Sequence, residues 1–211
     1  MVRLGPQTLG QEKTHAFLTP ICFLQLHNTC FDWDSPVYHS LVELQMGFLE
    51  DSDCPSVEQM AAILSACPEL RVLRLQAMTV WNYERVYFEP VPLNHLTMLD
   101  LMGMRARGLK VLLPILAPGP GELSLRTNMA YDLEVEQTPQ SFFSHSYVVW
   151  LFIQGTSVDR DFIRRHITLL KDLRVLIFDL DLQAESHGGD AKLAALVELP
   201  DSTGLTLRSP Q

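Results

Sequence analysis

The stretch LRVLIFDLDLQ, residues 173–183, admits two incompatible interpretations, and the choice between them decides the fold. A hydrophobic strand that ends in Asp179-x-Asp181 is typical of phosphatases in which the first carboxylate is a nucleophile and the second an acid/base. The same letters also form a strand of the type L-x-x-L-x-F, in which Leu173, Leu176 and Phe178 fill a core. The first interpretation predicts an enzyme, and the second predicts a scaffold.

The scaffold interpretation is favoured because similar strand-like segments recur along the chain. Eight segments carry apolar residues at alternate positions, and their last apolar residues are Leu26, Met46, Leu75, Leu101, Leu125, Ile153, Phe178 and Leu207. The successive gaps are 20, 29, 26, 24, 28, 25 and 29 residues, whereas a leucine-rich repeat has a period of roughly 20–29 residues. We therefore expect an α/β fold, a leucine-rich repeat solenoid of about eight irregular repeats over residues 18–211, after a poorly ordered segment 1–17.

The segments between these strands mostly have helical character. Residues 55–67 begin with Ser56 and carry Gln59 three positions later, a capping-box pattern followed by apolar residues at helical spacing. Residues 108–121, kinked at Pro114, and residues 157–173 and 188–199 are also predicted to be helical. Two segments, 79–93 and 126–146, have weak helical periodicity, so irregular or 3₁₀ structure is expected there.

Stacked repeats of this kind place a curved parallel sheet on the inside and the helices on the outside. Side chains alternate along a strand, so ladder residues face the shared core and their neighbours face the concave surface. The expected core residues include Leu73, Leu99, Leu123, Leu151, Leu176 and Leu205. The candidate partner-binding residues on the concave face are Phe23, Gln25, His27, Arg74, Gln76, Met98, Asp100, Met102, Arg126, Trp150, Phe152, Gln154, Val175, Ile177 and Asp179.

Aromatic, Met and Arg side chains are enriched at protein interfaces, so this set predicts a protein-binding surface. Two alternatives stay open at this point. Irregular repeats can bury some of these side chains under loops, and a shift of one residue in the strand around Trp150 would exchange its two faces.

Composition excludes several classes of function. A formal net charge of −9 argues against nucleic acid as a partner. No apolar run reaches membrane length and no signal peptide is seen, so a soluble cytoplasmic or nuclear protein is expected. Cys22, His27 and Cys30 could be drawn as half of a zinc site, but no second ligand pair has suitable spacing. No nucleophile elbow, phosphate-binding loop or metalloprotease motif occurs, so neither an enzyme nor a cofactor or metal is predicted.

The strings CPELRVLRLQAM (67–78), LNHLTMLDLMGM (93–104) and LKDLRVLIFDLDL (170–182) resemble repeats of fungal F-box-like leucine-rich repeat proteins. The resemblance spans about residues 18–208. It implies that the repeats select a substrate for a ubiquitin ligase, while an N-terminal F-box segment binds the ligase adaptor. Residues 1–17 do not match that segment, so adaptor binding is expected only if an F-box lies elsewhere in the protein, and the chain is expected to be a fragment or a repeat-only relative.

The function predicted from the sequence is therefore a protein–protein interaction scaffold. The alternative, an Asp-x-Asp hydrolase that uses Asp179 and Asp181, fits poorly. Leu182 and Gln183 stand where that motif has small or β-branched residues, and only 28 residues follow, too few for the remaining motifs.

Overall fold

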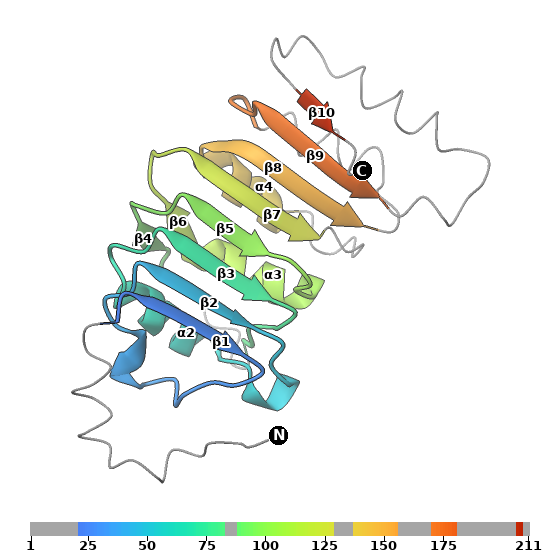
Figure 1. The fold of residues 1–211 in the computed structure, drawn as a ribbon. Helices are drawn as coiled ribbons and strands as arrows, with labels where there is room; N and C mark the ends of the chain where they lie inside the picture. Colours follow the sequence, from blue (N-terminus) through green and yellow to red (C-terminus); the bar gives the residue numbers. More distant parts are fainter. Residues whose placement is uncertain (1–20, 83–87, 129–136, 156–169, 181–205, 209–211) are drawn as a thin grey trace.

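The computed structural model describes residues 21–82, 88–128, 137–155, 170–180 and 206–208 (Figure 1). They form a mixed α/β fold around one open sheet in which each strand pairs in parallel with its neighbours. The strands follow one another across the sheet in chain order. They are β1 (Phe23–His27), β2 (Glu43–Gly47), β3 (Val72–Gln76), β5 (Met98–Leu101), β7 (Leu123–Asn128), β8 (Val148–Gly155), β9 (Val175–Leu180) and β10 (Thr206–Arg208). Each of these strands overlaps one of the eight predicted segments and includes its last apolar residue.

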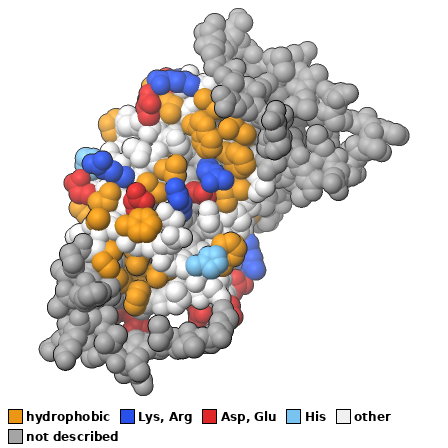
Figure 2. Space-filling model, in the orientation of Figure 1, with side chains coloured by type: hydrophobic (Ala, Val, Ile, Leu, Met, Phe, Trp, Pro, Cys, Tyr) orange, Lys and Arg blue, Asp and Glu red, His pale blue; other side chains and the backbone are white. Residues whose placement is uncertain are grey.

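The register of the sheet aligns the leucines of successive segments in one row. That row is Leu24, Leu44, Leu73, Leu99, Leu125, Leu151, Leu176 and Leu207. Its members from Leu24 to Leu176 are all buried, four of them with no exposed surface, and each such side chain contributes roughly 1.5–3 kcal/mol relative to exposure. The buried side faces the helices. We call the opposite side, turned toward the reader in Figures 1 and 2, the front face.

Two of the expected core positions differ from the predicted alignment. Leu125, not Leu123, lies opposite Leu99, and Leu207 rather than Leu205 lies opposite Leu176. A shift of two residues keeps every side chain on its own face, so Leu123 is still completely buried. Leu205 lies outside the described residues.

Strand β8 contains a register shift that sets which of its side chains face the helices. Leu123 lies opposite Val148 while Ser124 lies opposite Trp150, so Val149 has no counterpart in β7. This extra residue is a β-bulge, which resets the alternation of the strand. Leu151 and Ile153 consequently enter the core, and Trp150 lies on the front face, half-buried.

The other elements lie behind the sheet (Figure 1). They are the helices α2 (Val57–Ser65), α3 (Ala106–Leu112) and α4 (Gln137–His145), and β4 (Val91–Leu93) paired in parallel with β6 (Leu116–Pro118). Three 3₁₀ turns, η1 (Pro36–Tyr38), η2 (Asp51–Asp53) and η3 (Leu113–Ile115), complete the described part. Helix α2 has the predicted capping box: Ser56 N–H donates to Gln59 Oε1 at 2.9 Å, and Gln59 N–H donates to Ser56 Oγ at 3.3 Å.

Two of the segment predictions need correction. Residues 108–121 form the end of α3, then η3, and then β6 rather than one kinked helix, because Pro114 cannot continue the helical hydrogen bonds. Residues 137–145, expected to be irregular, are the helix α4, which buries Phe142 and Phe143 to 5% and 4% exposure. Residues 1–17 and 188–199, and all but the last four residues of 157–173, lie outside the described residues.

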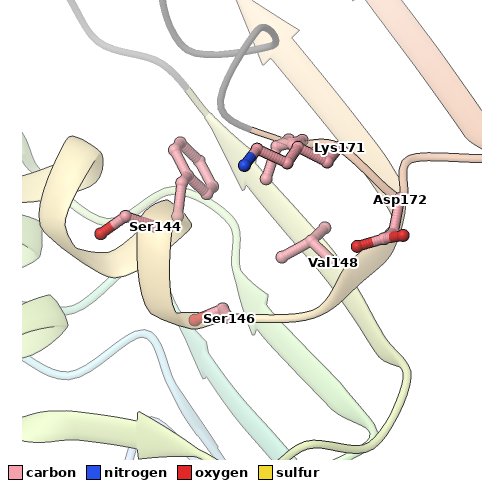
Figure 3. Close-up of a pocket in the computed structure, with 7 residues that line it drawn as sticks. Ser144, Ser146, Val148, Lys171 and Asp172 are labelled. Carbon is pink, nitrogen blue, oxygen red and sulfur yellow. The ribbon is translucent and has the colours of Figure 1, made fainter.

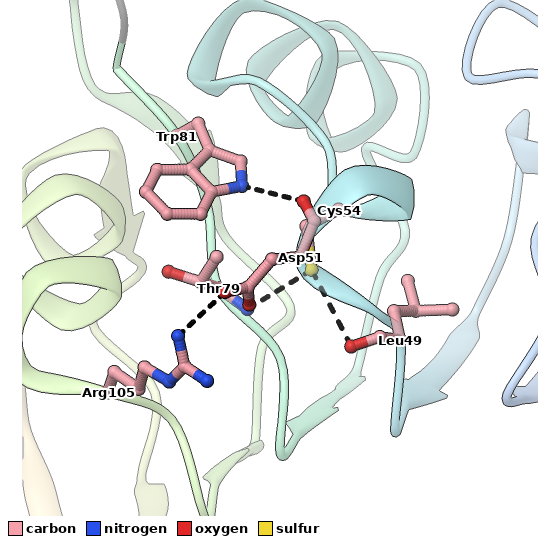
Figure 4. Close-up of polar contacts among 6 residues, drawn as sticks. All are labelled: Leu49, Asp51, Cys54, Thr79, Trp81 and Arg105. Carbon is pink, nitrogen blue, oxygen red and sulfur yellow. Dashed lines mark hydrogen bonds and ion pairs between the residues drawn. The ribbon is translucent and has the colours of Figure 1, made fainter.

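Contacts among the loops that follow β2, β3 and β5 join these units at the carboxyl ends of the strands (Figure 4). Arg105, after β5, forms an ion pair with Asp51, after β2, at 2.8 Å. Trp81 Nε1–H donates to the backbone oxygen of Asp51 at 3.0 Å, and Thr79 N–H donates to Cys54 Sγ at 3.5 Å. These loops are therefore fixed relative to one another and to the strand ends.

Candidate functional site

The front face brings the outward side chains of the central strands into straight rows. One row runs across β3 to β9 and consists of Arg74, Asp100, Arg126, Phe152 and Ile177. The row beside it consists of Val72, Met98, Ser124, Trp150 and Val175. Figure 2 shows hydrophobic side chains gathered over β8 and β9, with basic and acidic side chains next to them over the middle of the sheet. The sequence-predicted residues of these strands thus form one continuous surface.

Asp100 lies at the centre of this surface and is completely buried. Its Oδ2 accepts hydrogen bonds from Gln76 Nε2 at 3.2 Å and from Arg126 Nη1 at 3.1 Å. Its Oδ1 accepts the backbone N–H of Met102 at 3.1 Å. A buried carboxylate needs such partners to offset its lost hydration. The expected contact residue Asp100 therefore positions Arg126 and Gln76, and its own side chain is covered by them.

Arg126 joins the polar centre to the aromatic part of the surface. Its side chain is 40% exposed, and its guanidinium carbon lies 5.2 Å from the centre of the Phe152 ring. That ring stacks on Trp150, with centroids 6.3 Å apart and an angle of 11° between the planes. Arg126 is held on one side by the carboxylate and on the other by a ring face, which is a favourable environment for a cation. Three side chains from two strands thus form a rigid group.

Arg74 has a different environment, although it occupies the same row. Among the described residues, its Nη2 contacts only Met98 Sδ, at 3.3 Å, and its buried Nε has no hydrogen-bond partner. A thioether is a weak acceptor, and none of the ion pairs among the described residues includes Arg74. The central cluster, which we define as Arg74, Asp100 and Arg126, therefore combines two guanidinium groups with one carboxylate.

Other predicted residues lie at the two sides of this cluster. Toward β1, Phe23, Gln25 and His27 are exposed, Phe23 by 47%. Met102 is half-buried and takes part only through its backbone in the hydrogen bond to Asp100. Toward β9, Val175 and Ile177 are half-buried and Gln154 is exposed. Asp179 lies in β9 opposite Gln154. Asp181, its counterpart in the hydrolase alternative, is outside the described residues.

Phe48 is a surface aromatic that the sequence analysis missed. It is 50% exposed, and its ring centre lies 4.4 Å from that of His27. Its φ of 60° is in the left-handed region, as are those of Asn28, Ala77 and Gly103 (54°, 47° and 73°). The residues before Asn28, Phe48 and Ala77 lie opposite one another in the sheet register. The fold thus imposes this backbone turn just after the strand. The sequence signal that could have pointed to Phe48 is its position directly after a predicted strand.

A pocket of about 270 Å³ lies between the end of α4, the start of β8 and the loop before β9 (Figure 3). Ser144, Ser146, Lys171 and Asp172 supply its polar groups. Ser144 Oγ lies 2.9 Å from His145 Nδ1, within reach for a nucleophile and base. However, the same nitrogen is 2.8 Å from the carbonyl oxygen of Ser141, to which it can only donate. With a proton on that nitrogen, His145 cannot accept the Ser144 proton there, so this pair is not arranged as a catalytic dyad.

The four cysteines are free thiols, and burial raises the pKa of Cys30, Cys54 and Cys67. A raised pKa keeps a thiol protonated, which disfavours both metal binding and nucleophilic attack. Within the described ranges, no group of three or more His, Cys, Asp or Glu side chains is placed to hold a metal ion. The partial zinc pattern of Cys22, His27 and Cys30 is not completed by other described residues.

No family model, curated protein or solved structure matches the chain. In the part of the chain that the structure describes, none of the helices has the length and apolar character needed to span a bilayer.

Proposed function

We propose that this chain is a leucine-rich repeat solenoid that binds a partner protein on the front face of its sheet. The repeat assignment is supported by the row of aligned leucines, by strands that follow one another in chain order, and by the left-handed residue that recurs after the first strands. In such an array each unit buries its apolar side only against its neighbours. The opposite side of the sheet is then available for binding.

The observation that carries the proposal is the connected group of Trp150, Phe152 and Arg126 on that face. Trp and Arg are among the residues that contribute most to binding energy at protein interfaces, and Phe is enriched there. Stacking and the ion pair to Asp100 hold them in place before any partner arrives. Side chains that are already ordered lose less entropy on binding, so the same contacts give a higher affinity.

The resemblance to fungal F-box-like proteins extends this proposal to a biological role. In that role the front face selects a substrate protein for ubiquitination. Adaptor binding would require an F-box segment, which residues 1–17 do not resemble. The proposal concerns substrate recognition only.

The proposal is tested by affinity capture from cell extract with the wild type and with the double variant Trp150→Ala/Phe152→Glu. Partners that depend on the front face should be lost from the double variant and kept by Phe31→Glu. Phe31 is an exposed aromatic residue outside the strands, so its substitution adds the same charge away from the cluster. Each captured partner is then purified and its Kd measured, with the thermal unfolding of each variant as a check of folding. Equal binding by wild type and a folded double variant would move the binding site elsewhere.

A further inference from the structure

We infer that the front face recognises an acidic segment of its partner, in which a large apolar side chain packs on Trp150 and Phe152 while a carboxylate reaches Arg74. This inference rests on the proposed function, namely that the front face binds a protein. It adds the chemistry of the bound segment and the spacing of its two anchoring residues.

The charge of the central cluster provides the first argument. The carboxylate of Asp100 is enclosed by three donors and is 1% exposed, so it presents almost no negative charge at the surface. Arg126 has one end in that ion pair, whereas Arg74 has no carboxylate partner among the described residues. Glu43, on the neighbouring strand β2, lies opposite Val72 and forms no ion pair with Arg74. The cluster therefore carries one excess positive charge in a chain whose net charge is −9.

The chemistry of Arg74 shows what is missing from its surroundings. A guanidinium group has five N–H donors and binds carboxylates through two parallel hydrogen bonds. Within the described part of the chain, Arg74 uses one donor on a thioether, and its Nε has no partner. Its side chain is only half-buried, so other donors of the group can be reached from the front. A partner's carboxylate would supply acceptors that the described residues do not.

The register of the sheet fixes the distance between the two anchoring points. Arg74 and Phe152 occupy the same row, three strand steps apart, through Asp100 and Arg126. With roughly 4.8 Å between strands, this separation is about 14 Å. An extended peptide rises about 3.3 Å per residue, and its residues i and i+4 point to the same side. A segment that crosses the strands therefore matches the surface when its apolar residue and its Asp or Glu are about four residues apart.

The probe for this inference is a phage-displayed library of random linear peptides of about 12 residues, selected on the whole chain. Enriched sequences are expected to pair a Trp, Phe, Leu or Met with an Asp or Glu at a spacing of about four. Fluorescein-labelled copies are then titrated with wild type, Arg74→Gln and Arg71→Gln. Arg71 is an exposed arginine just before β3, so its substitution removes the same net charge outside the cluster.

The Arg74→Gln change is expected to weaken binding at least about tenfold, because a charge-assisted hydrogen bond is lost. The Arg71→Gln change should alter the Kd by less than about twofold, and rising salt should weaken wild-type binding. Some peptides could lose binding to Trp150→Ala/Phe152→Glu, contain no acidic residue and still bind Arg74→Gln. Such peptides would overturn the acidic-segment inference and leave the front-face function standing. If no selected peptide depended on the front-face variants, both would be overturned.

Discussion

Arg126 and Asp100 form an ion pair whose two ends differ sharply in exposure, since the arginine side chain is 40% exposed and the aspartate side chain 1%. The carboxylate anchors the pair within the sheet, and the guanidinium carries its charge to the surface beside Phe152. The pair therefore links the stability of the sheet to the shape of the proposed binding face.

The first prediction concerns this buried carboxylate. Asp100→Asn keeps the size of the side chain but removes the charge and places an amide where three donors converge. We expect a free energy of unfolding lower by about 2–3 kcal/mol in urea titrations, since a buried partner is left unmatched. The matched control is Asp51→Asn, which breaks an ion pair to Arg105 with both side chains more than half exposed. That pair should contribute about 1 kcal/mol or less, and equal losses for both variants would contradict the role given to Asp100.

The second prediction concerns the close approach of two strands at Gly47. A Cβ at this position would lie 2.7 Å from the backbone oxygen of Gln76, a contact that a flexible side chain cannot relieve. Gly47→Ala should therefore destabilise the protein by about 1–3 kcal/mol in urea titrations. Gly121→Ala is the control, because nothing lies within 4 Å of its Cβ. It should change the stability by no more than about 0.5 kcal/mol, and a neutral Gly47→Ala would show that the two strands can separate without cost.

Much of this fold could be predicted from the period of the leucines, and the reason is physical. A buried residue of each unit must pack against its counterpart in the next unit. The spacing of the buried leucines along the sequence therefore follows the spacing of the units. The expected alignment is off by two residues at Leu123 because it rests on apolar residues only. Thr127 of β7, which lies opposite Leu101, is polar but buried, with an exposure of 7%. A pattern of apolar residues therefore misses it.

The parts that could not be predicted depend on contacts between units rather than within them. Helix α4 has few strong helix-forming residues, and the burial of Phe142 and Phe143 favours it. The enclosure of Asp100 likewise depends on donors located 24 and 26 residues away in the sequence. The front face itself was predicted from alternation alone, but which of its side chains stay accessible was set by these cross-strand hydrogen bonds.

The third prediction concerns stability at high pH. Tyr38 is completely buried, its hydroxyl donates to the carbonyl of Phe31 and accepts that residue's N–H, and burial raises its pKa. The neutral phenol is therefore favoured in the folded state, so its contribution is fully present below the unfolded pKa of about 10 and is lost as the pH rises above it. Between pH 8 and pH 11 the wild type should lose about 1.4 kcal/mol more unfolding free energy than Tyr38→Phe.

The Tyr38→Phe variant also provides a check at neutral pH. It should be less stable than wild type by about 1 kcal/mol, because the N–H of Phe31 loses its acceptor. The two curves of unfolding free energy against pH should then converge under alkaline conditions. Parallel curves up to pH 11 would mean that Tyr38 ionises as readily in the folded chain as in the unfolded one.

The last prediction uses the left-handed turn that follows each of the first strands. Ala77 has a φ of 47°, and its N–H donates to Met102 O at 2.9 Å, so the next unit holds it in a conformation that costs an L-residue roughly 1–2 kcal/mol. Ala77→Gly removes this cost and should raise the free energy of unfolding by up to about 1 kcal/mol. The same substitution at Ala62, an exposed position in α2, should lower it by about 1 kcal/mol. Urea unfolding measures both changes. Opposite signs for the two substitutions would show that the packing of successive strands imposes the backbone conformation of Ala77. A loss of stability in both variants would contradict this.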